Sequence, residues 1–255
     1  MLYKQFSPST METKEYRMMF ISELHLERRN FFEGEAGKSI KALKEEITTK
    51  EKRIEELEEK VKDYKGGEPT EDQLISLSEI RDLKWDIDWA HEHIFAVNEM
   101  SIIYLFKHLE IGIKKLIEFV HPNANTKELF RWDIMQSFFK GKGIIFSELK
   151  GYSNVNQLRK LNNAFKHGDL SSVFGAIPEF PDYFYGGNEA IEKFYNRVRP
   201  EVDLFQQSLS EAVKKEQFDF SEERLGDMAT EYFGRMDKET AERFAEVLKK
   251  KWGNT

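Results

Sequence analysis

The positions of proline constrain what this chain can fold into more than any other feature of its sequence. The six prolines are Pro8, Pro69, Pro122, Pro178, Pro181 and Pro200. They leave four stretches of more than fifty residues without proline. Because proline breaks a helix interior at a cost of about 3 kcal/mol, such stretches permit long helices. Apolar residues also recur at helical spacing, and strict alternation is rare, so we predict an all-α helical bundle.

A heptad pattern occupies residues 38–64. β-branched residues recur every seven positions, and the position three residues later is most often leucine: Ile40, Ile47, Ile54, Val61 and Leu43, Lys50, Leu57, Tyr64. This pattern is typical of a coiled coil. A Gly-Gly-Glu-Pro linker follows, and a second stripe then begins after Thr70: Ile80, Leu83, Ile87, Ala90, Ile94, Val97. The short linker favours an antiparallel coiled-coil hairpin over 38–97, with a parallel coiled coil between two chains as the alternative.

The remaining chain divides into further helices. We expect them over residues 100–120, 126–140, 154–167 and 188–216, the last bent or interrupted at Pro200, with a helical pair in the tail capped at Ser221 and Asp237. The predicted regions are an N-terminal helical region with the hairpin (1–97), a helical bundle (98–217) and a helical tail (218–255).

The absence of cysteine removes several classes of chemistry. A chain with no cysteine has no disulfide, no thiol nucleophile and no cysteine-ligated metal. The N-terminus shows no secretory signal, and apolar stretches are far shorter than the ~20 residues that span a bilayer, so we expect a cytoplasmic protein without membrane contact. A net charge of −7 predicts no overall attraction to nucleic acid.

One helix combines an apolar face with a dense polar edge. At about 100° per residue, one face of residues 154–167 gathers Val155, Leu158, Leu161 and Phe165. The edge beside it carries Asn162, Lys166, Arg159, Asn163 and His167, which together can bind a phosphate and move a proton. The alternative is purely structural, because Lys166-His167-Gly168 is also typical of a helix C-terminus.

The segment Leu158-Arg-Lys-Leu-Asn-Asn-Ala-Phe-Lys-His-Gly168 resembles the signature helix of HEPN domains, whose motif is Arg followed after four to six residues by His. The chain is similar to this family over roughly residues 95–216. The resemblance implies a four- or five-helix bundle, usually a homodimer with paired signature helices. In active members the shared cleft cuts RNA without metal, with the Arg on the phosphate and the His in acid–base transfer.

His167 matches the motif histidine, and Asn163 matches the polar residue that follows the arginine. The arginine position itself holds Asn162, and an amide cannot replace a bidentate cation. Arg159 or Lys166 would have to supply the missing charge, although seven residues separate Arg159 from His167. The resemblance therefore leaves a ribonuclease and a non-catalytic HEPN-like protein equally open.

The region around this helix carries a local excess of positive charge. Residues 130–170 contain seven basic and three acidic side chains, a net of +4. Lys140, Lys142, Lys160 and Lys166 are the candidate RNA- or phosphate-binding residues. The alternative is that these are ordinary solvated lysines at helix ends and in loops.

Three other features suggest binding sites less strongly. His91 and His93 lie two positions apart, where helical side chains diverge, so no metal site is predicted. The aromatic loop over 180–185 is interpreted as a lid on the bundle, with base stacking as the alternative. Trp85 and Trp89 are expected in the core or the hairpin contact.

Two function classes follow from these patterns. The first is a metal-independent endoribonuclease of a toxin or defence system, without a cofactor, acting as a homodimer on RNA with His167 in acid–base chemistry. The second is a non-catalytic scaffold that recruits a protein partner, such as an antitoxin, through the hairpin and the tail. A regulator that binds a nucleotide or small ligand under the aromatic loop is a third, weaker option.

Overall fold

The computed structural model describes residues 14–23, 29–62, 68–122, 124, 129, 131–173, 175–181 and 187–253, of which 29–31 and 251–253 are described by their backbone only. These residues form eight α-helices: α1 (Lys14–Glu23), α2 (Arg29–Val61), α3 (Glu71–Val120), α4 (Trp132–Lys140), α5 (Tyr152–His167), α6 (Gly187–Phe218), α7 (Glu222–Phe233) and α8 (Lys238–Gly253). Within the described ranges, pairing of β type is limited to one isolated bridge between Ile177 and Phe180. The predicted all-α fold is confirmed.

The chain forms two compact units, residues 1–211 and 212–255, and the boundary falls within α6. The sequence predicted a boundary after residue 217, six residues from this one, and a further division after residue 97. That position lies inside α3, which is a single 50-residue helix, so hairpin and bundle share one uninterrupted helix. Thr70 begins α3 with a capping box, in which its hydroxyl accepts from the backbone N–H of Gln73 and the Gln73 side chain accepts from the Thr70 N–H.

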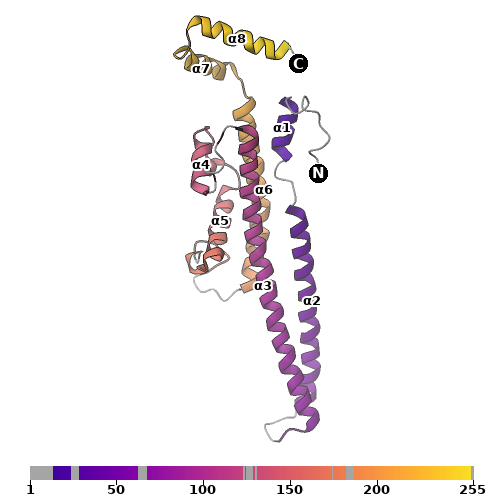
Figure 1. Cartoon of the computed structure of the whole chain (residues 1–255). Coiled ribbons are helices and arrows are strands. Elements are labelled where there is room, and N and C mark those ends of the chain that lie inside the picture. The colour runs from indigo at the N-terminus through magenta and orange to yellow at the C-terminus, as the bar shows by residue number, and fades with distance from the viewer. Residues whose placement is uncertain are drawn as a thin grey trace. The chain divides into compact units, whose positions relative to one another are not determined.

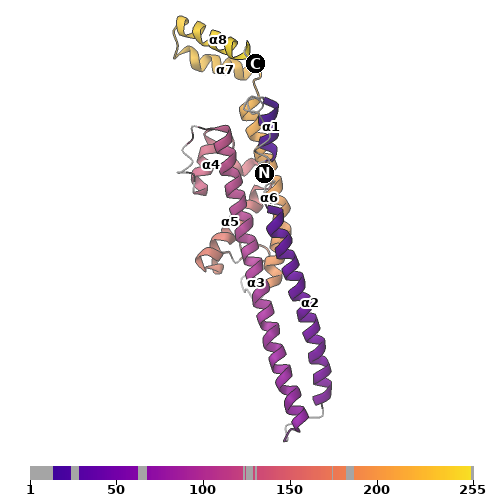
Figure 2. The ribbon, with the colours of Figure 1, turned by 45° about the vertical axis from the view of Figure 1, so that its right-hand side comes forward.

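The helices α2 and α3 form an antiparallel arm, visible in both views of the ribbon (Figures 1 and 2). The heptad residues of α2 face the predicted stripe of α3: Ile47 packs with Ala90 and Ile94, and Ile54 and Leu57 pack with Ile80. Lys50, which interrupts the heptad, donates to the carboxylate of Asp86 on α3 at 2.8 Å. The hairpin thus closes within one chain, while supercoiling of its arms stays a prediction.

The second half of α3 enters a bundle with α4, α5 and α6. Asn188 of α6 donates to the backbone oxygen of His91, and a Cβ on Gly112 would lie 3.2 Å from the Gln206 amide. The two contacts progress in the same direction, so α6 runs parallel to α3. Aromatic rings with centroids 5.3 to 5.7 Å apart continue the core from α3 through α4 to α6: Phe106, Trp132, Phe146, Phe139 and Phe205.

Pro200 does not interrupt α6, which is continuous from residue 187 to 218. A tighter constraint lies at Gly151, the residue before α5, where φ is +77°. A Cβ at this position would approach the backbone oxygen of Glu201 to 2.3 Å. Glycine therefore sets how closely α5 approaches α6, because any side chain would collide with the α6 backbone.

The unit formed by residues 212–255 is a small pair of helices with little buried surface. The predicted caps are confirmed: Ser221 accepts from the N–H of Arg224, and Asp237 accepts from that of Thr240. The Tyr232 and Phe244 rings stack 6.1 Å apart. No residue of α7 is buried. Its apolar residues, and those of α8 that are described, therefore remain largely in contact with solvent.

Candidate functional site

The helix α5 carries the residues that resemble the HEPN signature. Its apolar face lies where the pattern predicted it, with Val155, Leu158 and Leu161 fully buried in the bundle. At its C-terminus Gly168 has φ +66°, and its N–H is directed at the carbonyl oxygens of Ala164 and Phe165. The left-handed glycine cap expected from Lys166-His167-Gly168 is present. This local role accounts for Gly168 without any catalytic function.

Asn162, which occupies the motif arginine position, does not lie at the solvent edge. It is 0% exposed. Its Nδ2 donates to Oδ1 of Asn163 at 3.3 Å, and its own Oδ1 has no hydrogen-bond partner among the described residues. The helical projection of α5 places Asn162 next to the apolar face. The bundle buries this residue together with that face, which the projection alone does not show. A phosphate in solvent therefore cannot reach the Asn162 side chain without opening the bundle.

The other polar residues of α5 remain more open but are not brought to one point. Both the Nε and an Nη of Arg159 donate to Oδ1 of Asn156, at 3.2 and 3.0 Å, so one edge of the guanidinium is held by its own helix. Asn163, Lys166 and His167 are exposed, as is Lys160. None of them lines the cavity where α2, α3 and α6 meet or the smaller one between α1, α3 and α6.

Lys140 and Lys142 lie at and just beyond the end of α4 and are both exposed. Within the described ranges, no hydrogen bond or ion pair joins either of them to α5. The Lys142 N–H donates to the Phe139 carbonyl oxygen in the turn that ends α4. The two lysines are therefore placed by the C-terminus of α4, as the alternative of solvated lysines at helix ends supposes.

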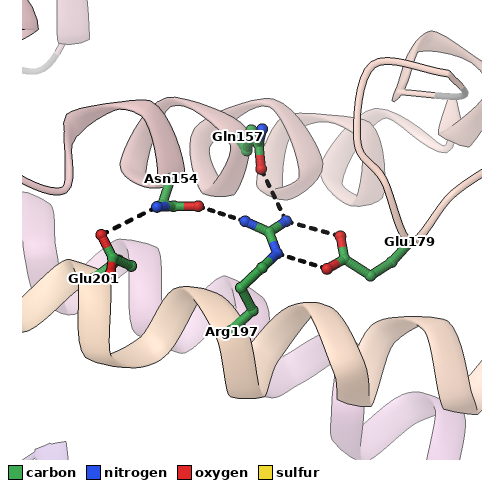
Figure 3. A network of polar contacts seen from close by, with 5 residues as sticks. All are labelled: Asn154, Gln157, Glu179, Arg197 and Glu201. Atoms are coloured by element: carbon green, nitrogen blue, oxygen red, sulfur yellow. Dashed lines mark hydrogen bonds and ion pairs between the residues drawn. The ribbon is translucent and has the colours of Figure 1, made fainter.

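The most elaborate polar cluster lies elsewhere, around Arg197 of α6 (Figure 3). Arg197 forms a two-pronged ion pair with Glu179, with N–O distances of 2.6 and 2.8 Å. It also donates to the side-chain oxygens of Asn154 and Gln157 on α5, and Asn154 donates to Glu201. Its guanidinium lies 5.3 Å from the centroid of the Phe194 ring.

The Arg197 cluster has a structural reading that follows from its charges. The hydrogen bonds from Arg197 lower the pKa of the Glu179 carboxyl. All three nitrogens of the guanidinium donate within the chain, so Arg197 ties the segment around Glu179 to α5 and α6 rather than presenting a cation to a ligand. Sequence reasoning missed it because the partners are 18 to 43 residues from Arg197 along the chain.

A cavity of about 650 Å³ lies where α2, α3 and α6 meet. Its wall includes Ala36, Ile40, Asn98, Ser101, Glu192 and Tyr195. Asn98 is only 5% exposed, and its Nδ2 has no partner in the described residues. Beside it, Lys44 and Glu192 form an ion pair at 2.7 Å. The sequence held no signal for this cavity, because its lining comes from three helices far apart in the chain.

Trp85 and Trp89 are not core or hairpin residues, so this expectation was wrong. Their exposed fractions are 63% and 59%. At about 100° per residue they lie roughly 150° around α3 from the residues that face α2. The exposed Leu74, Ile75 and Met100 share this side of α3, and we call the five residues together the tryptophan stripe. The two tryptophans, one turn apart, form its apolar centre, whereas a single exposed apolar residue would need no explanation.

Several expectations on other residues can be compared with the structure. Phe180 is fully buried and stacks edge-on against Phe194, while residues 182–186 of the aromatic loop lie outside the described residues. His91 and His93 are exposed, and the described residues contain no group of three or more side chains suited to a metal ion. Among the helices in the described ranges, none combines the length and the apolar character needed to cross a membrane.

The geometry thus separates two surfaces: the polar end of α5, with its exposed histidine, and the tryptophan stripe of α3. Comparison of the chain with family models, with curated proteins and with solved structures finds no match in any of the three. What the chain does must therefore be argued from these two surfaces themselves.

Proposed function

We propose that this chain is a non-catalytic, HEPN-like scaffold that binds a partner protein through the outer face of its helical arm. The observation that carries the proposal is the exposure of Trp85 and Trp89, at 63% and 59%. Tryptophan is enriched at the centre of protein interfaces and among the residues that contribute most to binding. Covering both rings would contribute roughly 3 kcal/mol each, from the apolar area that they expose.

The architecture of the arm also supports a scaffold. The inner face of α3 is already closed by α2, so the arm does not need the tryptophan stripe for its own stability. The stripe lies on one continuous helix that extends into the bundle. A partner bound there would be joined to the bundle by this uninterrupted helix.

The arrangement of α5 gives less support to catalysis. Asn162 is buried, and Arg159 is held by Asn156, so neither residue is placed for the phosphate-binding role that the HEPN resemblance implies. Acid–base chemistry requires its groups to converge on one reacting atom. In this chain the exposed members of the motif, Asn163, Lys166 and His167, line neither the cavity between α2, α3 and α6 nor the one between α1, α3 and α6.

Site-specific photo-crosslinking in the native host tests the scaffold proposal. A benzophenone amino acid in place of Trp89 should form a covalent adduct with one partner protein. The matched control places the same group at Lys52, which is exposed on α2 of the same arm. Adducts at both positions, or at neither, would contradict a specific interface on the outer face of α3.

A ribonuclease is the second candidate, and one observation favours it: Asn163, Lys166 and His167 are all exposed at the same end of α5. A homodimer that pairs two α5 helices could bring the second copy's basic residues to this end. Incubation of the full-length protein with RNA in EDTA tests this function. Cleavage that is lost in His167→Ala would establish it; equal results for both proteins would dismiss it.

A further inference from the structure

The tryptophan stripe carries charge of one sign. On the face of α3 centred on the stripe, between residues 71 and 100, a helical projection at about 100° per residue places three carboxylates within about 55° of the stripe's centre: Glu71, Asp82 and Glu92. No lysine or arginine of residues 71–100 falls on the same face. The nearest, Arg81, lies at its margin and donates to Asp82 at 3.3 Å. The surface is therefore apolar at its centre and anionic around it.

These carboxylates are only partly neutralised by the chain itself. Asp82 accepts from Arg81, whereas Asp86, which the projection places between the stripe and the side that faces α2, accepts from Lys50 of α2. Glu92 takes part in no hydrogen bond or ion pair within the described ranges, and both Glu71 and Glu92 are exposed. The indole faces of Trp85 and Trp89 also attract cations, since the π-face of tryptophan is electron-rich. Each component of the surface thus favours a positively charged occupant.

From these observations, and resting on the scaffold proposed above, we infer that the partner presents a cationic amphipathic helix to the tryptophan stripe. Its apolar residues at helical spacing would cover the two indoles, and its Lys or Arg residues would flank them to meet Glu71, Asp82 and Glu92. From Ile75 to Met100 the stripe runs for roughly 37 Å at 1.5 Å per residue, which matches a partner helix of about 25 residues.

The same charges argue against the other occupants of such a surface. Nucleic acid and anionic lipid carry the charge that the carboxylates repel. A second copy that paired the same face would bring its own carboxylates to the surface that already carries Glu71, Asp82 and Glu92, so the pairing would join two anionic faces. A basic helix from another protein avoids both conflicts.

Two synthetic peptides can test this inference on the full-length protein. Both are 18-residue helices with the same leucine face. All remaining positions are lysine in one peptide and glutamate in the other, and each peptide is labelled with fluorescein for anisotropy. We expect the lysine peptide to bind at least about tenfold more tightly at low salt, and its affinity to fall as salt is added. Trp85→Ala/Trp89→Ala should abolish binding, and Asp82→Asn/Glu92→Gln should reduce the preference.

Ile145→Ala is the matched control, because Ile145 is also an exposed apolar residue but lies on the bundle. It should bind the lysine peptide as the unaltered protein does. Equal affinity for the two peptides, or binding of neither, would overturn the inferred partner chemistry. The inference would also be overturned if sedimentation showed that the unaltered protein is a dimer and that Trp85→Ala/Trp89→Ala is a monomer. An adduct at position 89 without a peptide preference would overturn this inference and leave the scaffold standing.

Discussion

Apolar residues lie on two faces of α3, but the chain buries only one of these faces. On one face Ile80, Ala90 and Ile94 are buried against α2. On the other, Trp85 and Trp89 are the largest side chains of the arm and stay open. Helical periodicity identifies a stripe, but only the arrangement in space shows whether the chain itself supplies its partner. The open stripe is therefore where a molecule other than this chain is expected.

The largest effect is expected from breaking the closed face. Leu57 lies between α2 and α3 and is 2% exposed. Leu57→Asp would bury a carboxylate there without a partner. We expect a loss of about 4 kcal/mol or more in the stability of the arm. Amide hydrogen exchange should accelerate throughout α2 and the first half of α3. Unchanged protection in these segments would show that the stability of the arm does not depend on the contact between α2 and α3 at Leu57.

Gly151→Ala should have the next largest effect, on the bundle rather than on the arm. The added Cβ would meet the Glu201 carbonyl oxygen, and alanine disfavours the positive φ at this position. We expect a loss of about 3 kcal/mol, measured by urea unfolding. Gly143→Ala is the matched control, because its φ is +75° but nothing lies within 4 Å of its Cβ. A similar loss in both variants would assign the effect to φ alone.

Arg197→Met should cost about 2 kcal/mol, because it leaves the mostly buried Glu179 carboxylate and two amide side chains without their donor. Lys193→Met is the control, since the ion pair of Lys193 with Glu189 is exposed and such pairs contribute about 0 to 1 kcal/mol. Thermal unfolding measures the change in melting temperature that each variant causes, and so compares the partly buried Arg197 cluster with an exposed ion pair. Equal shifts in melting temperature would contradict the role given to Arg197.

The Glu179 carboxyl also predicts a pH dependence. Its pKa is lowered in the folded state by the hydrogen bonds from Arg197, so ionisation of Glu179 stabilises the fold above the ordinary carboxyl pKa. This contribution should be lost as the pH falls through the lowered folded pKa. The stability difference between the unaltered protein and Glu179→Gln should therefore shrink from pH 7 towards pH 3. A constant difference would mean that Glu179 acts only through its shape.

The smallest effect on stability is expected on the open face. Trp85→Ala/Trp89→Ala should change the free energy of unfolding by less than about 0.5 kcal/mol, because the two rings do not contribute to the core. Urea unfolding followed by far-ultraviolet circular dichroism measures this without relying on tryptophan fluorescence. A loss as large as that of Leu57→Asp would return both tryptophans to the core and remove the reason for a partner.

Local chemistry explains which elements could be predicted from the sequence. The heptad over Ile47, Ile54 and Leu57 and the caps at Thr70 and Gly168 depend on residues close together in the chain, and each is found in the structure. The helix α1 was not predicted, and its burial of Ile21 depends on distant residues such as Ser210 of α6, which donates to the Ile21 oxygen.

The site depends more on long-range packing. The identity of the residues on α5 is readable from the sequence, whereas the burial of Asn162 depends on what covers the helix. Trp85 and Trp89 were assigned to the core because aromatic residues four apart on a helix usually pack there. The Arg197 cluster could not be anticipated, since its partners on α5 and near Glu179 meet only after the bundle forms.

The comparison between the tryptophan stripe and the end of α5 can be decided in one measurement. A photo-crosslinking residue is placed in the full-length protein either at position 89 or at position 167, and adducts formed in the native host are separated into protein and RNA. The scaffold predicts a protein adduct at Trp89 and no RNA adduct at His167. An RNA adduct at position 167, with none of either kind at position 89, would contradict it.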